Sequence, residues 1–278
     1  MTDMILANEP IFRVSAFFGI LAAIAVWEAL EPRRARSFSR WLRWPNNLSI
    51  IALNTVLARL AFPVAAVGTA ALTEQRGWGI FNVFDVPEMA AIVISVVALD
   101  FAIYLQHVLF HAVPSLWRLH RMHHADLDFD VTTGARFHPI EILLSMGLKL
   151  GAVSALGAPA VAVIVFEVLL NGTAMFNHGN IRIATAVDTV LRWFVVTPDM
   201  HRVHHSAVPR EANSNFGFSL PWWDRLFGTY RDQPADGHEG MNIGIAQFRD
   251  RRELWLDRLL TQPFRGAYGP YPLSRSED

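Results

Sequence analysis

The hydrophobic positions of this chain gather into long continuous segments separated by short polar stretches. Residues 11–30, 48–72 and 89–113 each form an apolar segment of about the length that crosses the hydrocarbon core of a bilayer. Residues 139–171 are also mostly apolar, but they are broken near 157–159 into halves that are short for full spans. The pattern predicts an all-α integral membrane protein with three transmembrane helices and a helical hairpin.

A cleaved signal peptide is the competing interpretation of residues 11–30. Signal peptides begin with a basic region, whereas here the arginines follow the apolar segment. We therefore predict a retained helix.

The polar stretches set the expected orientation. Residues 31–44 contain five arginines and one glutamate, which places this loop in the cytoplasm by the positive-inside rule. The third helix then returns to the cytoplasmic side, and the hairpin enters and leaves from that side. We expect N-terminal helices and loops over 1–88, a catalytic region over 89–235 and a cytoplasmic tail over 236–278. The histidine-rich part would form a cytoplasmic cap.

Composition narrows the possible functions. The chain has 278 residues, 52% of them hydrophobic, and a net charge of −1, so nothing suggests nucleic-acid binding. It has no cysteine, which excludes thiolate-bound zinc, iron–sulfur clusters and thiolate-bound haem. A single lysine among 24 basic residues suggests a GC-rich bacterial genome, and hence the bacterial inner membrane. In a eukaryote the endoplasmic reticulum is the expected location.

Ten of the eleven histidines lie between His107 and His205. Spacings of three and four residues return side chains to one face of a helix, so each cluster can aim several imidazoles at one point. The clusters are HVLFH, HRMHH and HRVHH, with His107, His111, His120, His123, His124, His201, His204 and His205. Eight imidazoles exceed the needs of one tetrahedral ion and suit two.

Imidazole suits iron, copper, nickel and zinc. Soluble di-iron bundles use glutamates with a Glu-x-x-His pattern, but these clusters contain no carboxylate at ligand spacing. Burying so many imidazoles without a metal would carry a large desolvation cost. We therefore predict metal binding for the eight histidines, and treat His238, outside every motif, as an ordinary core residue.

The three clusters resemble the histidine boxes of the fatty acid hydroxylase/sterol desaturase superfamily. Flanking segments agree in the same order: TTGARFHPIE at 132–141, NHGN at 177–180 and WWDRLFGTY at 222–230. The resemblance covers about residues 100–230. It implies a membrane-bound non-haem di-iron oxygenase that uses two iron ions, dioxygen and two electrons to hydroxylate or desaturate a lipid.

The resemblance also implies the site. The eight box histidines would be metal ligands, His178 matches a further ligand position, and no catalytic residue beyond the ligands is expected. His138 could be a ligand, a hydrogen-bond donor behind the ligands or a structural residue. The other candidates for orienting the ligands are Glu141, Asn177, Asn180 and Asp199. Asp199 could instead be the N-cap of a helix after Pro198.

Asp100 and two tryptophans remain to be placed. Asp100 lies within the third apolar segment, where an ionisable residue is costly and is usually paired or functional. It could accept a hydrogen bond from a ligand histidine or pair with Arg59, and its depth favours the ion pair. We expect Trp222 and Trp223 to anchor the protein at the membrane interface, ahead of a role in a substrate channel.

No Gly-rich dinucleotide fingerprint is present, so we expect no nicotinamide, flavin or haem on this chain and a separate electron donor. A small acidic redox protein, ferredoxin-like or a cytochrome, could dock by charge near the third box. Positive-inside topology or attraction to anionic lipids explains the same charges equally well. The arginines concerned are Arg202, Arg210, Arg225 and Arg231.

The expected substrate is a lipid: a sterol, a fatty acyl chain, an ether lipid or a carotenoid. The RFHP, NHGN and FGTY motifs favour the sterol desaturase and ether-lipid branch, and hydroxylation is the default reaction. The alternative function is a non-enzymatic metal- or lipid-binding membrane protein that retains the histidine boxes.

Overall fold

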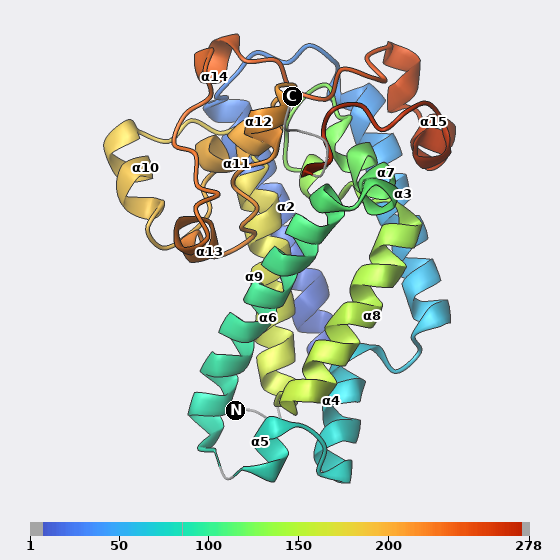
Figure 1. Cartoon of the computed structure of the whole chain (residues 1–278), viewed down its shortest axis with the longest axis vertical. Coiled ribbons are helices and arrows are strands. Elements are labelled where there is room, and N and C mark those ends of the chain that lie inside the picture. Colours follow the sequence, from blue (N-terminus) through green and yellow to red (C-terminus); the bar gives the residue numbers. More distant parts are fainter. Residues whose placement is uncertain (1–7, 85, 274–278) are drawn as a thin grey trace.

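The computed structural model describes residues 8–84 and 86–273. Over these residues the chain is helical, and the only β-structure is two isolated bridges, between Pro32 and Ile181 and between Ser206 and Ile243. Long helices run together along one axis, and short helices and loops cover one end of them (Figure 1). The prediction of an all-α protein is confirmed.

Five segments of the described chain are long and apolar enough to cross a membrane. Both helices of the predicted hairpin are 18 residues long and are among them, so they are longer than the sequence suggested. The segments are α2 (Glu9–Leu30), the run from α3 (Arg40–Ala61) through α4 (Ala65–Arg76) to α5 (Ile80–Val83), α6 (Glu88–Ala112), α8 (Pro139–Leu156) and α9 (Ala160–Asn177). The chain is thus an integral membrane protein.

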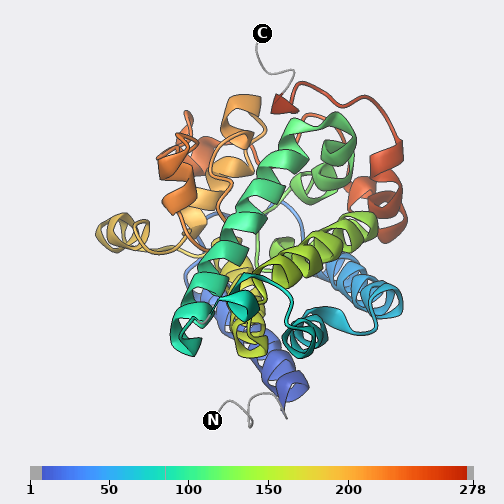
Figure 2. The same cartoon turned by 60° about the horizontal axis from the view of Figure 1, so that its bottom comes forward.

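Helix α9 is central among these helices. It contacts α2, α4 and α6, and the view from the end with α4 and α5 shows the other long helices around it (Figure 2). Large apolar side chains such as Ile11, Phe18, Leu60 and Leu148 point outward from the bundle. An apolar outer surface of this kind fits contact with lipid tails.

The second apolar segment is not one continuous helix, as the sequence analysis expected over 48–72. Helix α3 ends at Ala61, and α4 begins at Ala65. Pro63 has no N–H to donate and disfavours helical geometry at Phe62, which adopts φ −130° and ψ 72°. The chain turns here, and α4 packs against α8 and α9.

The predicted break near 157–159 is confirmed. Helix α8 ends at Leu156, and the next residue, Gly157, caps it with a left-handed φ of 67°, a conformation that glycine adopts without strain. Helix α9 continues past the predicted end at 171 to Asn177, and His178 follows directly. The length of α9 therefore determines where His178 lies.

Asp100 does not pair with Arg59, and that prediction was wrong. Its carboxylate accepts hydrogen bonds from the backbone N–H groups of Ser219 and Leu220, each at 3.3 Å, and from Trp223 Nε1 at 2.8 Å. Arg59 lies on an exposed position of α3. Asp100 therefore ties the membrane helix α6 to the loop before α13 (Trp222–Leu226), and Trp223 serves this contact.

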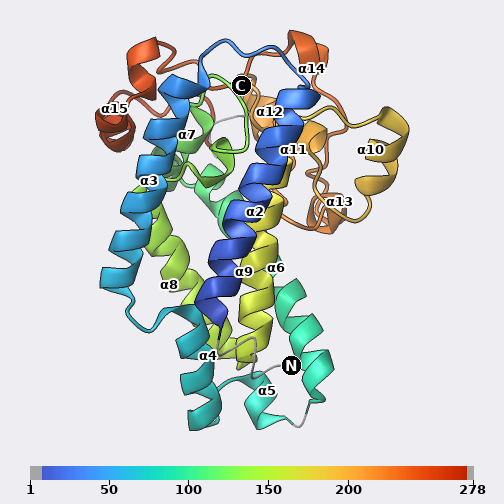
Figure 3. The same ribbon diagram turned by 180° about the vertical axis from the view of Figure 1, so that it is seen from behind.

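The cap consists of short helices joined by loops. The loop between α2 and α3 crosses the cap at the end of the molecule opposite α4 and α5 (Figure 3). Residues up to 273 belong to this packing, because the Trp117 ring stacks on Tyr271 at 5.4 Å. Besides α13, its elements are α7 (Pro114–His124), η1 (Thr133–Ala135), α10 (Thr185–Leu191), α11 (Pro198–His204), α12 (Pro209–Ala212), α14 (Gly237–Gly240), η2 (Arg251–Leu254), α15 (Leu256–Thr261) and η3 (Gln262–Phe264).

A buried charge cluster joins the start of α3 to the cap. Arg43 donates to both carboxylate oxygens of Asp126, at 2.9 and 2.7 Å, and also contacts Asp130. Arg136 Nη1 lies 3.0 Å from Asp126 Oδ1. All four side chains are almost fully buried. The cluster fixes the segment that follows the second histidine box.

Candidate metal centre

The structure brings the eight box histidines and His178 together in two buried groups. Within each group the candidate ligand nitrogens lie within 4.8 Å of one another. The first group is His107, His111, His120, His124 and His204, and the second is His123, His178, His201 and His205. Each group is large enough to hold one metal ion, so the geometry matches the predicted pair.

Four elements position these side chains. Helix α6 carries the first box one turn before its end, and α7, which starts with Pro114 at a favourable first position, carries the second. Helix α11 carries the third box and His178 caps the end of α9. The N-cap of α11 is Thr197, whose hydroxyl accepts from Met200 N, so the N-cap interpretation of Asp199 was wrong.

Backbone carbonyls fix the protonation of three of these histidines. The Nδ1 atoms of His107, His178 and His204 lie 2.7 Å from the carbonyl oxygens of Phe216, Ala174 and Ser214, respectively. A carbonyl oxygen only accepts, so each Nδ1 must carry the proton and donate it. The lone pair is therefore on Nε2, the atom that faces the other histidines.

The Nε2 atoms of neighbouring imidazoles face one another at short range. His107 and His120 are 3.1 Å apart at these atoms, and so are His111 and His124. In the second group, His178 Nε2 lies 3.2 Å from the Nε2 atoms of His123, His201 and His205. Metal–nitrogen bonds of about 2.0–2.1 Å bring ligand nitrogens to about this separation. Unprotonated nitrogens at this distance repel one another, and a cation bound between them would accept their lone pairs. The residues therefore fit two metal ions.

Burial keeps these imidazoles neutral. Outside the membrane helices, burial lowers the pKa of His120 and of His178 to about 3. Burial, followed by the neighbouring imidazoles, places the pKa well below the ordinary 6.5 for His123, His124, His201, His204 and His205. Neutral imidazole is the form that binds metal, so the site is ready for ions at neutral pH.

Glu141 is the carboxylate behind the ligands. It lies in the first turn of α8, and its Oε1 atom is 2.7 Å from His120 Nδ1. A carboxylate at this position orients the imidazole and raises its basicity as a ligand. The sequence analysis named Glu141 for this role, and the geometry fits it.

Substituting Glu141 tests this contact. Glu141→Leu removes the acceptor, and we expect it to lower metal affinity about 10–100-fold. Glu141→Gln retains an oxygen that can accept from Nδ1, so it is the matched control and should stay closer to wild type. Metal titration against a competing chelator measures both. Equal affinity in Glu141→Leu and wild type would contradict the role.

The loop at 213–216 supports three of these histidines, and the sequence analysis did not identify it. Ser214 and Phe216 supply the carbonyls described above, and Asn213 Oδ1 lies 3.1 Å from His111 Nδ1. Asn215 has a left-handed φ of 53° and donates to Met200 O at 2.8 Å, which ties the loop to α11.

Asp224, in the WWDRLFGTY motif, holds this loop in place. Its carboxylate accepts from the N–H groups of Phe216 and Gly217, both at 2.8 Å, and from the Thr229 hydroxyl at 2.7 Å. Burial raises the pKa of Asp224 to about 6, although these donors favour the ionised form. The motif therefore acts on the histidines indirectly, through the backbone.

Four of the proposed supporting residues lie outside both histidine groups. His138 caps α8 by accepting from Ile140 N at 3.2 Å. Asn177 donates to Phe218 O at 2.9 Å, and Asn180 is bonded to the backbone of Arg34. Asp199 pairs with Arg33 at 3.2 Å and with Arg202. These contacts cap a helix or join neighbouring segments, so the four residues have structural partners outside the two histidine groups.

Aromatic rings enclose the histidines on the side facing the bundle. Phe137 stacks on His123 at 4.3 Å, and Phe218 packs on His107 at 5.1 Å between ring centres. Phe218 belongs to an apolar cluster, and Phe137 packs against it, with members such as Leu99 and Val163 on α6 and α9. The histidines thus border the apolar interior of the membrane helices.

Gly134 allows the cap to approach the second group closely. A Cβ atom there would lie 2.4 Å from Ala174 O and 3.2 Å from His178 Nδ1. Only glycine fits without moving the end of α9. The TTGARFHPIE motif therefore includes a steric requirement of the site.

Of the four arginines proposed for docking, Arg202 is buried, whereas Arg210 is exposed and Arg225 and Arg231 are half-buried. The Arg202 side chain is fully buried, contacts Asp199 and lies over the Phe129 ring at 5.2 Å. Arg225 packs against the rings of Trp193 and Tyr230, at 4.0 and 4.1 Å. Arg202 therefore cannot meet a partner protein.

Comparison with known proteins places this site in a family. A family profile described as fatty acid hydroxylase matches residues 92–229. The ornithine lipid hydroxylase OlsE of Rhizobium tropici is 33% identical over 82% of this chain and 69% of its own length. Alkylglycerol monooxygenases are more distant: that of Xenopus tropicalis is 29% identical over 47% of this chain and the human protein 25% over 54%. The chain spans only 28% and 32% of those two proteins. No solved structure matches the chain significantly.

Proposed function

The chain belongs to the fatty acid hydroxylase family of membrane-bound lipid oxygenases, and on that premise we propose that it hydroxylates a C–H bond of a membrane lipid at two iron ions. The observation that carries the proposal is the pair of buried histidine groups whose Nε2 atoms face one another. All nine histidines are proposed as ligands, five to one ion and four to the other.

Two bound iron ions would supply the activation of dioxygen for attack on an unactivated C–H bond. The residues of the chain supply the conditions for it. The imidazoles bind as neutral ligands, and Glu141 and the carbonyls of Ser214 and Phe216 orient them. Phe137 and Phe218 keep water from the side of the site that faces the membrane helices.

A lipid substrate follows from the position of the site. The apolar cluster under Phe137 and Phe218 is continuous with the interior of the membrane helices. We propose that the substrate chain or headgroup approaches from this side. An ornithine lipid is the first substrate to test, because the relative named for it aligns with most of this chain. An alkylglycerol is the second.

We further propose that the cap faces the cytoplasm of a bacterial cell. The arginine-rich loop 31–44 lies at the cap end of the molecule, as the positive-inside rule requires for that orientation. A relative from a bacterium supports the bacterial inner membrane as the location. The two electrons of each turnover would come from a separate donor protein.

Lipid analysis with isotopically labelled dioxygen tests the proposed function. Membranes containing the protein would be supplied with an ornithine lipid or an alkylglycerol, a reductant and labelled dioxygen. We expect one labelled oxygen atom in the product. Loss of two hydrogens without label would indicate desaturation instead. No new product from either lipid, in protein that holds two iron ions, would favour the non-enzymatic alternative.

A further inference from the structure

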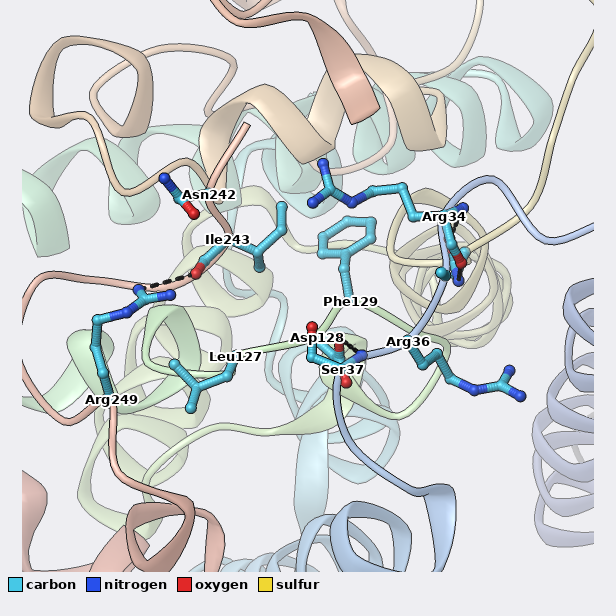
Figure 4. A pocket seen from close by; sticks show the side chains of 11 residues that line it. Arg34, Arg36, Ser37, Leu127, Asp128, Phe129, Asn242, Ile243 and Arg249 are labelled. Carbon is cyan, nitrogen blue, oxygen red and sulfur yellow. Dashed lines mark hydrogen bonds between the residues drawn. The ribbon is translucent and has the colours of Figure 1, made fainter. Parts of the chain in front are cut away.

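A small polar cavity of about 80 Å³ lies in the cap (Figure 4). The loop between α2 and α3, which lines it, is at the end of the molecule away from α4 and α5 (Figure 1). Three segments and Asn180 line the cavity, and the segments are the loop after α2, residues 127–129 and residues 242–249. Figure 4 places Arg36 and Arg249 on opposite sides of the cavity and Phe129 between them. No role described above uses this cavity.

One side chain, Phe129, lies between the cavity and the second histidine group. Phe129 is 4% exposed and lines the cavity, while its ring stacks on His178 at 5.3 Å and 27°. The same ring meets His205 edge-on at 5.1 Å. A single aromatic residue therefore separates the surface of the cap from two histidines of the second group.

The charges around the cavity are mostly positive. Arg36 is exposed and has no ion pair within the described part of the chain. Arg34 and Arg249 donate to backbone carbonyls, and among the described residues neither has a carboxylate oxygen within 4.0 Å, although Asp128 and Glu239 act on Arg34 at longer range. Asp128 is the one carboxylate in the lining, and both of its oxygens already accept from the N–H groups of Ser37 and Phe38. The cavity is thus suited to a carboxylate-bearing partner.

We propose that this cavity is the docking surface for a small acidic one-electron carrier protein, and that electrons pass by Phe129 to the second histidine group. The proposal rests on the proposed function. Hydroxylation consumes one dioxygen, two electrons and two protons, and yields the hydroxylated lipid and water. Two reduced carriers would each give one electron and leave oxidised.

A soluble partner fits this position better than an anionic lipid. The exposed apolar residues Leu226 and Phe227 lie at the end of α13, which is nearer the membrane helices than the loop between α2 and α3 is (Figure 1). Apolar side chains of this kind mark the edge of the cap that faces the membrane. The cavity lies beyond them, on the side that a carrier in solution can reach.

Binding of a purified acidic carrier tests the proposal without any turnover. The protein would be held in nanodiscs of phosphatidylcholine, with oxidised plant-type ferredoxin as the probe. We expect Arg36→Glu to weaken binding about tenfold, and salt to weaken binding of the wild type. Arg76→Glu reverses a charge at the opposite end of the molecule and is the matched control, with unchanged affinity. Arg36→Lys should also bind as the wild type does.

Turnover measurements distinguish a failure of the docking proposal from a failure of the proposed function. Arg36→Glu should lose ferredoxin-driven turnover and keep the single turnover obtained after reduction with dithionite. If the wild type forms no product by either route, the proposed function fails while the binding result stands. No binding of ferredoxin to the wild type, or equal binding by Arg36→Glu, would overturn the docking proposal. An effect of Arg36→Glu that appears only with phosphatidylglycerol in the discs would assign the cavity to lipid and overturn it as well.

Discussion

Replacing His178 with alanine is expected to remove one of two metal ions and to lower lipid hydroxylation by more than about a hundredfold. His178 lies outside the three boxes, yet its Nε2 atom is within 3.2 Å of three other imidazole nitrogens. Its loss leaves the second group with three ligands and an open side at the end of α9. Metal content per chain and turnover of the purified protein measure the two effects.

His138→Ala is the control for this prediction. His138 is also buried, but it caps α8 and lies outside both groups. The variant should lose about 1 kcal/mol of stability, the typical contribution of a helix cap, and keep both ions. Two ions per chain in His178→Ala would contradict the ligand assignment, and loss of an ion in His138→Ala would contradict the structural one.

Replacing Asp126 with alanine is expected to cost about 3–5 kcal/mol of folding stability. Burial alone would raise the pKa of Asp126, but Arg43 and Arg136 hold that pKa below its usual range, so the carboxylate is ionised at neutral pH. Its removal leaves two buried guanidinium groups without their shared partner. Thermal unfolding in detergent, followed by tryptophan fluorescence, should show a clear loss relative to wild type.

Glu74→Ala provides the comparison for Asp126→Ala. Glu74 is exposed near the end of α4, and a surface substitution of this kind changes stability by about 0.5 kcal/mol or less. If Asp126→Ala unfolded as Glu74→Ala does, the buried charge cluster would not be a source of stability.

Much of the fold could be predicted from the sequence because membrane helices need long apolar segments. The ends of α2 and α6 and the break at Gly157 follow from that requirement and from local turn chemistry. The break at Pro63 was readable in principle, but the length of the apolar segment favoured one span. The partner of Asp100 was not readable, since it depends on backbone groups more than a hundred residues away.

The histidines that gather into the two groups could be predicted from the sequence, whereas most of the groups that support them, Glu141 excepted, could not, for a physical reason. Ligand spacing within α7 or α11 is a local property of a helix, so the sequence displays it directly. The groups behind the ligands are largely backbone carbonyls, such as those of Ser214 and Phe216, and every residue type carries a carbonyl. His138 and Asp199 have the residue types of site residues but serve the packing of the cap.

The docking face inferred from arginines near the third box is the sequence-based prediction that the structure supports least. Arginines close in sequence to the third box suggested a docking face, but Arg202 turns inward to Asp199 and Phe129. The positively charged cavity is instead assembled from residues that lie far apart in the sequence, from Arg34 to Arg249. Burial decides which arginines can meet a partner, and burial of a polar side chain depends on tertiary structure.

The central claim is a pair of metal ions held by histidines, and metal content tests it most directly. Plasma mass spectrometry would compare the detergent-solubilised wild type with a His123→Ala, His204→Ala double variant, which removes one ligand from each group. We expect two ions per chain in the wild type and their loss in the variant. One ion or none in well-folded wild type would contradict the di-iron account.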